Sequence, residues 1–159
     1  MKKENLVKYI SFALAVLILG LLVMQFLPFW TTEKETVSMN EYLWMPNEHK
    51  SVTKLFKAEL DDKKFDPIKI VLWPVLTLVL GVAGIVLCIL KRGEFLPCLM
   101  TVLCGATGVL TYFTNPVYQM GANWQLHAAV AAVVLVAGLA SVVIHLIPEK
   151  KAAAITPSK

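Results

Sequence analysis

Charged residues are missing from four long stretches of this 159-residue chain. Residues 9–30, 70–90, 96–113 and 126–147 contain no Asp, Glu, Lys or Arg. Each stretch is long enough to cross a bilayer as a helix, since the hydrocarbon core needs about 20 apolar residues. The hydrophobic content of 57% is also higher than a small soluble domain could bury around one core. The sequence therefore predicts an all-α integral membrane protein, a compact bundle of four transmembrane helices forming a single multi-pass domain.

The lack of charge inside the spans also excludes classes of membrane function. Ion and proton transporters usually place an ionisable side chain at membrane depth, and here only His127 and His145 are available, each near a span end. Both are interpreted as packing residues, with a pH-sensing role as the alternative. No Ser/His/Asp set, metal-spaced cluster or Gly-rich phosphate loop is present. We expect no enzymatic activity, no cofactor and no metal site.

Cysteine is scarce, and its spacing argues against thiol chemistry. Cys88, Cys98 and Cys104 form no Cys-x-x-Cys pair, so the chain lacks the attacking and resolving thiols of a disulfide-exchange enzyme. We interpret these cysteines as small hydrophobic packing residues.

The charges that are present flank the spans and predict an orientation. The N-terminus, the turn after the second span and the tail at residues 148–159 are short and lysine-rich, which places both termini in the cytoplasm by the positive-inside rule. The outer side then holds a long loop, residues 31–66, and an uncharged connection, residues 114–125. The net charge of +4 is explained by topology, so nucleic acid is not an expected partner. Fourteen lysines and a single arginine favour a bacterial source, and hence a bacterial inner or cytoplasmic (plasma) membrane.

The first span is expected to be a retained helix. Its apolar run is longer than the 7–15 residues typical of a signal peptide, and it ends without a small-residue cleavage site. Trp30, Trp73 and Trp124 lie near the outer ends of their spans, where tryptophan commonly anchors a helix at the membrane interface.

Small and weakly polar residues recur inside three spans at steps of three and four, which keeps them on one helix face. Such faces allow close helix contact and interhelical hydrogen bonds, so we expect them to pack the bundle interior, with a ligand pathway as the alternative. The predicted packing seam consists of Thr77, Gly81, Gly84, Cys88, Thr101, Cys104, Gly108, Thr111, Ala131, Gly138 and Ser141.

The first span shows no single seam of this kind. One candidate face includes Ser11, Ile18 and Gln25, and another includes Ala13 and Gly20. The first helix is therefore expected to be the least tightly packed or to contact a partner, with Gly20 and Gln25 as candidate contact residues.

The outer loop is the largest segment outside the spans and the expected place of recognition. Its first half contains the apolar run Tyr42, Leu43 and Trp44. In its second half Ser51 is expected to N-cap a short amphipathic helix. The apolar face of that helix consists of Val52, Leu55, Phe56 and Leu60. This helix would cover the bundle, lie on the outer leaflet or bind another protein.

These observations give three functional hypotheses. The first is a non-catalytic accessory or scaffold subunit that meets a membrane-protein partner, or a second copy of itself, through the outer loop or the first helix. The second is an oligomeric channel or carrier for a neutral or apolar solute, lined by the small-residue seams. The third is an envelope sensor that uses the outer loop and His127. In each case the lipid bilayer surrounds the spans.

Overall fold

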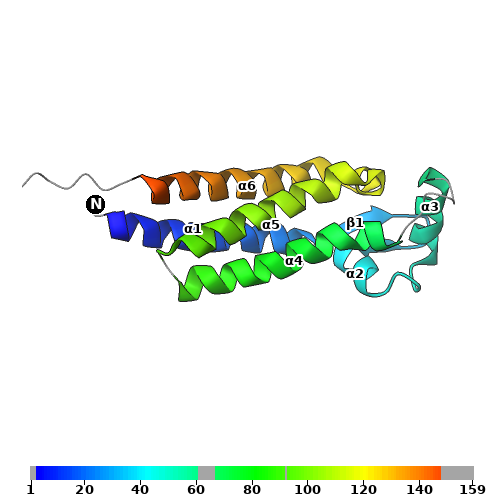
Figure 1. Ribbon diagram of the computed structural model, residues 1–159. Helices are drawn as coiled ribbons and strands as arrows, with labels where there is room; N and C mark the ends of the chain where they lie inside the picture. Colours follow the sequence, from blue (N-terminus) through cyan, green and yellow to red (C-terminus); the bar gives the residue numbers. More distant parts are fainter. Residues whose placement is uncertain (1–2, 61–66, 92, 148–159) are drawn as a thin grey trace, which may run out of the picture.

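Four long helices run side by side along one axis in the computed structural model, which describes residues 3–60, 67–91 and 93–147 (Figure 1). They are α1 (Lys3–Met24), α4 (Pro67–Leu90), α5 (Phe95–Thr114) and α6 (Trp124–Leu146). Each contains a window long and apolar enough to cross a membrane. The prediction of a mostly helical chain with four helices of membrane-spanning length is therefore confirmed.

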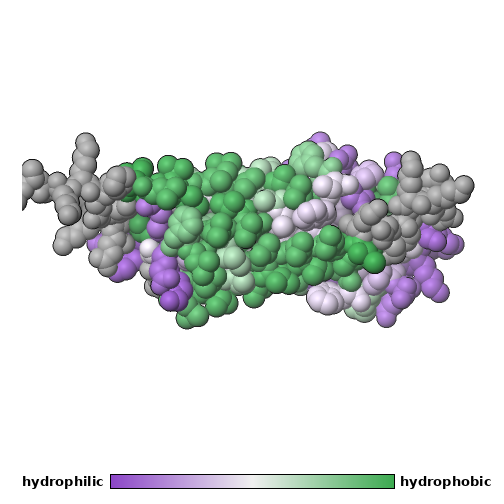
Figure 2. Space-filling model, in the orientation of Figure 1, coloured by the Kyte–Doolittle hydropathy of each residue, from purple (hydrophilic) through white to green (hydrophobic). Residues whose placement is uncertain are grey.

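The other three long helices all contact α5. This helix packs against both α4 and α6, and α1 packs against all three. Figure 2 shows the apolar side chains of the helices gathered in one broad band, with polar side chains concentrated toward its two ends. An outward apolar band is the surface that a membrane helix presents to lipid, since lipid tails offer no hydrogen-bond partners.

The two ends of the bundle differ in structure (Figure 1). The start of α1, the end of α6 and the α4–α5 turn lie together at what we call the terminal end. The opposite end, the cap end, carries shorter elements: β1 (Pro28–Thr31), β2 (Thr36–Ser38), α2 (Met39–Trp44), α3 (Lys50–Leu60) and the 3-10 helix η1 (Pro116–Met120). Residues 28–60 together with η1 are called the cap.

Local hydrogen bonds explain how the cap begins. β1 and β2 form an antiparallel hairpin, and the Thr32 amide donates to the Glu35 carbonyl at 2.8 Å across its turn. α2 follows directly and starts with a capping box: the Ser38 hydroxyl accepts from the Glu41 amide, and the Glu41 carboxylate accepts from the Ser38 amide, each at 3.1 Å. The capping box thus fixes the N-terminal end of α2 by two reciprocal bonds.

A proline inside α4 connects this helix to the cap. Pro74 has no N–H, so the Ile70 carbonyl one turn earlier lacks its usual helical donor. The Tyr118 hydroxyl of η1 donates to that carbonyl at 2.6 Å. The hydroxyl therefore satisfies the acceptor that proline leaves open, and it fastens η1 to the beginning of α4.

The first span is where the sequence prediction differs most from the structure. α1 ends at Met24, and residues 28–31 form strand β1 in place of the last turn of a helix. Trp30 is 1% exposed and donates its indole N–H to the Val117 carbonyl at 3.1 Å. The prediction that Trp30 anchors the helix at the membrane interface is wrong, because tertiary contacts bury it inside the cap.

Helix α1 is also better packed than the sequence indicated. A third of its apolar window is buried (33%), against 28% for α4 and 22% for α6. The expectation that α1 is the least tightly packed helix is wrong. Its buried face carries Ser11, Leu14, Ile18 and Leu21, which contribute to the interior at several depths.

Candidate functional site

The cap has a core of its own, made of aromatic side chains from separate elements. Trp30 of β1 lies at its centre, with ring centroids 5.0 Å from Phe56, 5.3 Å from Tyr118 and 5.6 Å from Tyr42. The Trp30–Phe56 and Trp30–Tyr42 pairs have the edge-to-face geometry that aromatic rings prefer. Burial raises the pKa of the Tyr42 hydroxyl and, more strongly, that of Tyr118. Both hydroxyls therefore stay neutral near pH 7.

Phe29 joins this core to the end of the bundle. Its ring lies 4.9 Å from the His127 ring of α6 and 6.3 Å from the Tyr112 ring of α5. The Tyr112 hydroxyl and His127 Nδ1 are 3.3 Å apart, and the Ala122 amide donates to the Phe29 carbonyl at 2.6 Å. The aromatic core thus covers the cap end of the four-helix bundle, and the connection after α5 forms part of that cover.

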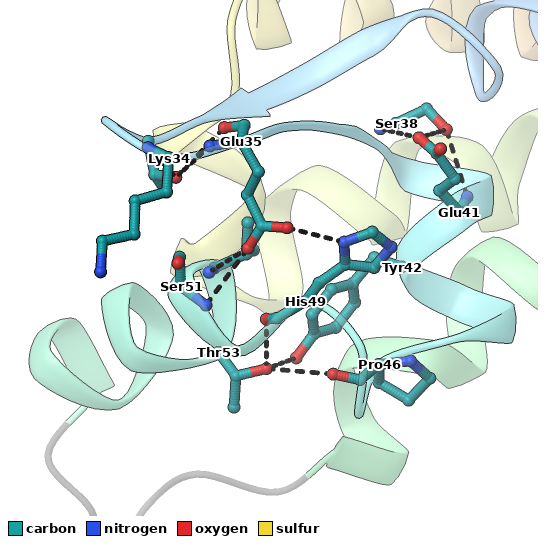
Figure 3. A network of polar contacts seen from close by, with 11 residues as sticks. Lys34, Glu35, Ser38, Glu41, Tyr42, Pro46, His49, Ser51 and Thr53 are labelled. Atoms are coloured by element: carbon teal, nitrogen blue, oxygen red, sulfur yellow. Dashed lines mark hydrogen bonds and ion pairs between the residues drawn. The ribbon is translucent and has the colours of Figure 1, made fainter.

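The Glu35 carboxylate of the hairpin accepts hydrogen bonds from the first turn of helix α3 (Figure 3). Glu35 Oε1 accepts from the amides of Ser51 and Val52 at 3.2 and 3.3 Å, and Glu35 Oε2 accepts from His49 Nδ1 at 2.9 Å. These are the first-turn amides that an N-cap side chain normally satisfies. The prediction that Ser51 is the N-cap is wrong: α3 begins at Lys50, and the acceptor comes from Glu35, far away in sequence.

A second set of bonds links α2 to α3 in the same network (Figure 3). The Thr53 hydroxyl lies 3.0 Å from the His49 carbonyl and 3.3 Å from the Pro46 carbonyl, and it has one hydrogen to donate to them. The Tyr42 hydroxyl, 3.2 Å from Thr53 Oγ1, therefore serves as the donor to that oxygen. The hairpin, α2 and α3 are held together by directed bonds as well as by apolar contact.

An open groove lies on the surface between the hairpin and α3. Its volume is about 560 Å³, and polar and apolar residues line it together. The lining residues are Thr31, Thr32, Glu33, Lys34, Ser51, Lys54 and Leu55. A concave surface built on fixed elements is suited to recognition, because its side chains need little ordering when a ligand or partner binds.

Of the outer-loop residues predicted to form an interaction surface, most are buried and only two are accessible. Tyr42, Leu43, Val52 and Phe56 are buried within the cap, so they cannot meet a partner unless the cap opens. Leu60 is partly buried and packs against the same core. The accessible members are Leu55, which is half-buried in the groove, and Trp44, which is 64% exposed.

The two candidates on the first helix also have different surroundings. Gly20 is exposed, and a Cβ added there would meet no heavy atom within 4 Å. Gln25 is 4% exposed, and its backbone carbonyl accepts from the Asn40 amide at 2.9 Å. Gly20 therefore lies on the outward face of α1, whereas Gln25 is an internal residue at the junction with the cap.

All residues of the predicted packing seam are buried. Thr77 of α4 donates to the Thr107 hydroxyl of α5 at 3.0 Å, and Cys104 donates to the Thr77 carbonyl at 3.6 Å. Two glycines face the backbone of the neighbouring helix directly: a Cβ at Gly105 of α5 would meet the Leu135 backbone, and one at Gly138 of α6 would meet the Val102 backbone. Gly105 was not part of the predicted seam; it is adjacent to seam residue Cys104 but faces α6.

The terminal end has a polar cluster of its own. His145 Nδ1 lies 3.0 Å from the Ser141 carbonyl and 3.5 Å from Cys98 Sγ, while Nε2 lies 3.2 Å from the Gly93 carbonyl. The Gly93 amide donates to the Ser11 hydroxyl at 3.3 Å. These bonds connect α1 and α6 to the α4–α5 turn, where Gly93 has a positive φ of 91° that suits glycine.

One missed feature of the cap had a local signal in the sequence. The order Ser38-x-x-Glu41 before an apolar run is the capping-box pattern and predicts the start of α2. The pairing of Glu35 with His49 and the first turn of α3 had no such signal, because it depends on how the hairpin lies against α3.

Acid is expected to weaken the attachment of α3 to the hairpin. The hydrogen bond from His49, together with bonds from the Val52 and Ser51 amides, lowers the pKa of Glu35 below its ordinary 4.5. Because the folded-state pKa lies below the unfolded one, the stabilisation is complete above about pH 4.5 and is lost as pH falls through the folded-state value. The protection factors of the Ser51 and Val52 amides against hydrogen exchange, taken relative to the intrinsic rate at each pH, should therefore fall in that acid range.

Glu35→Gln should remove most of this pH dependence and destabilise the start of α3 by about 1 kcal/mol, the usual value of an N-cap acceptor. Glu33→Gln is the matched control, since Glu33 is exposed on the same turn. Equal acid sensitivity in the two variants would show that another group is responsible.

Comparison of the chain with protein-family models, with curated proteins and with solved structures gave no match. Among the residues that the structure describes, no three His, Cys, Asp or Glu side chains are grouped so that they could hold a metal ion. The cap and its groove are therefore the candidate functional site on geometry alone.

Proposed function

We propose that the protein is a non-catalytic accessory or scaffold subunit in a bacterial plasma membrane. In this proposal both termini are cytoplasmic, and the cap lies on the outer side. The orientation is supported by Lys8 and Lys91 near the terminal end, which the positive-inside rule assigns to the cytoplasm. The partner is the outer part of another membrane protein, which binds the groove between the hairpin and α3.

The observation that carries this proposal is that the cap has a buried aromatic core of its own and an open groove on its surface. Its aromatic side chains are used in its own core, except for Trp44, and its hairpin is bonded to α3 through Glu35. The groove beside these contacts holds Lys34, Lys54 and Glu33, charges that can select a complementary partner. Such a rigid surface costs little entropy to bind.

The interior of the bundle favours this proposal over the channel or carrier. At mid-depth a buried cluster fills the space among α1, α5 and α6 with apolar side chains. It consists of Ile18, Leu21, Leu22, Cys104, Ala131 and Val134. The hydroxyls of the seam donate to carbonyls of their own helices or to one another. A solute path would therefore have to lie between copies of the chain. The sensor hypothesis has no specific observation in its favour.

Native purification with a charge-reversal variant tests the proposal. The protein is purified from its own membrane in a mild detergent after brief cross-linking, and the stoichiometry of any co-purifying protein is measured. We expect a stoichiometric membrane-protein partner for the unmodified chain, and Lys54→Glu in the groove should lower its affinity about tenfold.

Lys50→Glu provides the control, because it makes the same charge reversal on α3 outside the groove lining. Recovery of the unmodified protein only as an isolated chain would overturn the proposed function. Equal binding by both variants would move the recognition surface away from the groove, and Gly20→Leu would then test the outward face of α1.

A further inference from the structure

One aromatic residue of the cap is not used in its core. Phe29, Trp30, Tyr42, Phe56 and Tyr118 are each exposed by 2% or less. Trp44, at the end of α2, is 64% exposed, and the following Met45 is 45% exposed. Exposing a large apolar side chain to water has a cost, which is removed if the ring lies in an apolar or interfacial environment.

The only polar atom of the Trp44 side chain already has a partner. Its Nε1 donates to Asn40 Oδ1 at 3.0 Å, one turn earlier on the same helix. A buried N–H without an acceptor would oppose transfer out of water. Because this bond is made within α2, the ring can leave water without losing a hydrogen bond.

Helix α2 lies beside the lipid-facing surface of the bundle. The Asn40 amide donates to the Gln25 carbonyl just after α1, and α2 also contacts α4 (Figure 1). The neighbouring ends of those two helices expose Phe26 (56%) on one side and Ile68 (74%) on the other. Helix α2 therefore lies next to the cap end of the apolar band, and the exposed Trp44 and Met45 are at its C-terminal end.

The charges on α2 indicate how such a contact would work. The helix contains Glu41 but no Lys or Arg, so attraction to anionic headgroups is not available to it. Tryptophan, by contrast, prefers the boundary between headgroups and acyl chains without needing lipid charge. A protein partner would also cover an aromatic ring, but continuity with the lipid-facing band favours the bilayer.

We propose that Trp44 and Met45 insert at the headgroup–acyl boundary of the leaflet on the cap side, so that α2 anchors the cap to the lipid surface. The interfacial contact that the sequence predicted for Trp30 is thus assigned to Trp44, while Trp30 lies in the cap core. The anchor fixes the height of the groove above the membrane. It does not depend on the proposed partner.

Fluorescence quenching of the full chain tests this assignment. The purified protein is placed in phosphatidylcholine vesicles, with or without bromine atoms close to the lipid headgroup, and compared with Trp44→Phe. The difference between the two proteins gives the emission of Trp44. We expect brominated lipid to reduce this difference by about half or more, as for an interfacial indole, and aqueous iodide to have little effect.

Asn47→Trp in the Trp44→Phe background is the matched control, because Asn47 is exposed in the loop that follows α2. Its emission should be quenched by iodide and not by brominated lipid. If Trp44 behaves like this control in vesicles, the lipid anchor is wrong. If Trp44 is shielded from iodide only in native membranes, a protein partner covers it, and the proposal is again overturned. Adding anionic lipid should not change the quenching, and a strong increase would contradict the assigned mechanism.

Discussion

Gly105→Leu is expected to disrupt the bundle more than any other single change to a small residue in the spans. A Cβ at this position would meet the backbone of Leu135 on α6, with the Leu135 Cα only 2.6 Å away. Backbone atoms cannot rotate aside as a side chain can, so the two helices would have to separate. We expect a loss of at least about 3 kcal/mol, at the upper end of the cost of overpacking.

Thermal unfolding in mild detergent measures this effect. The midpoint should fall by roughly 10 °C or more, or the variant should fail to accumulate as a folded protein. Gly20→Leu is the matched control, because nothing lies within 4 Å of its added Cβ, and its midpoint should stay close to that of the unmodified chain. A Gly105→Leu protein as stable as the control would contradict the close approach of α5 and α6.

Trp30→Ala is expected to open the cap while leaving the four long helices in place. The Trp30 side chain is 1% exposed, contacts rings from three other elements and donates to the Val117 carbonyl. Truncating a fully buried aromatic residue costs about 3–5 kcal/mol. That loss should fall mainly on the cap, because the rings and the carbonyl that Trp30 contacts belong to β1, α2, α3 and η1.

Limited proteolysis and hydrogen exchange across residues 28–60 provide the measurement. Both should accelerate strongly in Trp30→Ala, while the helical circular dichroism signal stays nearly unchanged. The rates for Trp30→Phe should lie between those of the unmodified chain and of Trp30→Ala. This variant keeps a ring but leaves the Val117 carbonyl without its donor, at a cost of about 1–3 kcal/mol. In detergent, Trp44→Ala should leave the cap intact, so equal sensitivity at positions 30 and 44 would refute the assignment of the cap core.

The interior of the bundle was largely predictable from the sequence because membrane helices leave a strong local pattern. Small and weakly polar residues gain little from contact with lipid but allow close packing against another helix. Their spacing at steps of three and four indicates which helix face makes that contact. Thr77, Thr101 and Ser141 were found in this way, and all three are buried. Gly105 was missed because α5 packs against more than one helix, so it buries residues on a second face that a single-face pattern does not include.

The cap was predictable only in part, for a different physical reason. The amphipathic pattern of Val52, Leu55, Phe56 and Leu60 falls within helix α3, since an apolar helix face is a local property. The side chain that accepts from the first-turn amides of α3 could not be predicted, because Glu35 reaches them only when the hairpin is folded against α3. Trp30 was assigned to the membrane interface because an apolar run gives no sign of where a helix ends and a strand begins.

By itself, the sequence determined that the chain has four apolar helices of membrane-spanning length, and it predicted for three of them a seam of small residues that are buried. These are consequences of composition and helical periodicity, which act over a few residues. The tertiary structure decided which tryptophan is buried and which is exposed, which glycine permits the closest helix contact, and that a groove lies beside α3. Each of these depends on groups far apart in the chain that come together only when the cap closes over the bundle.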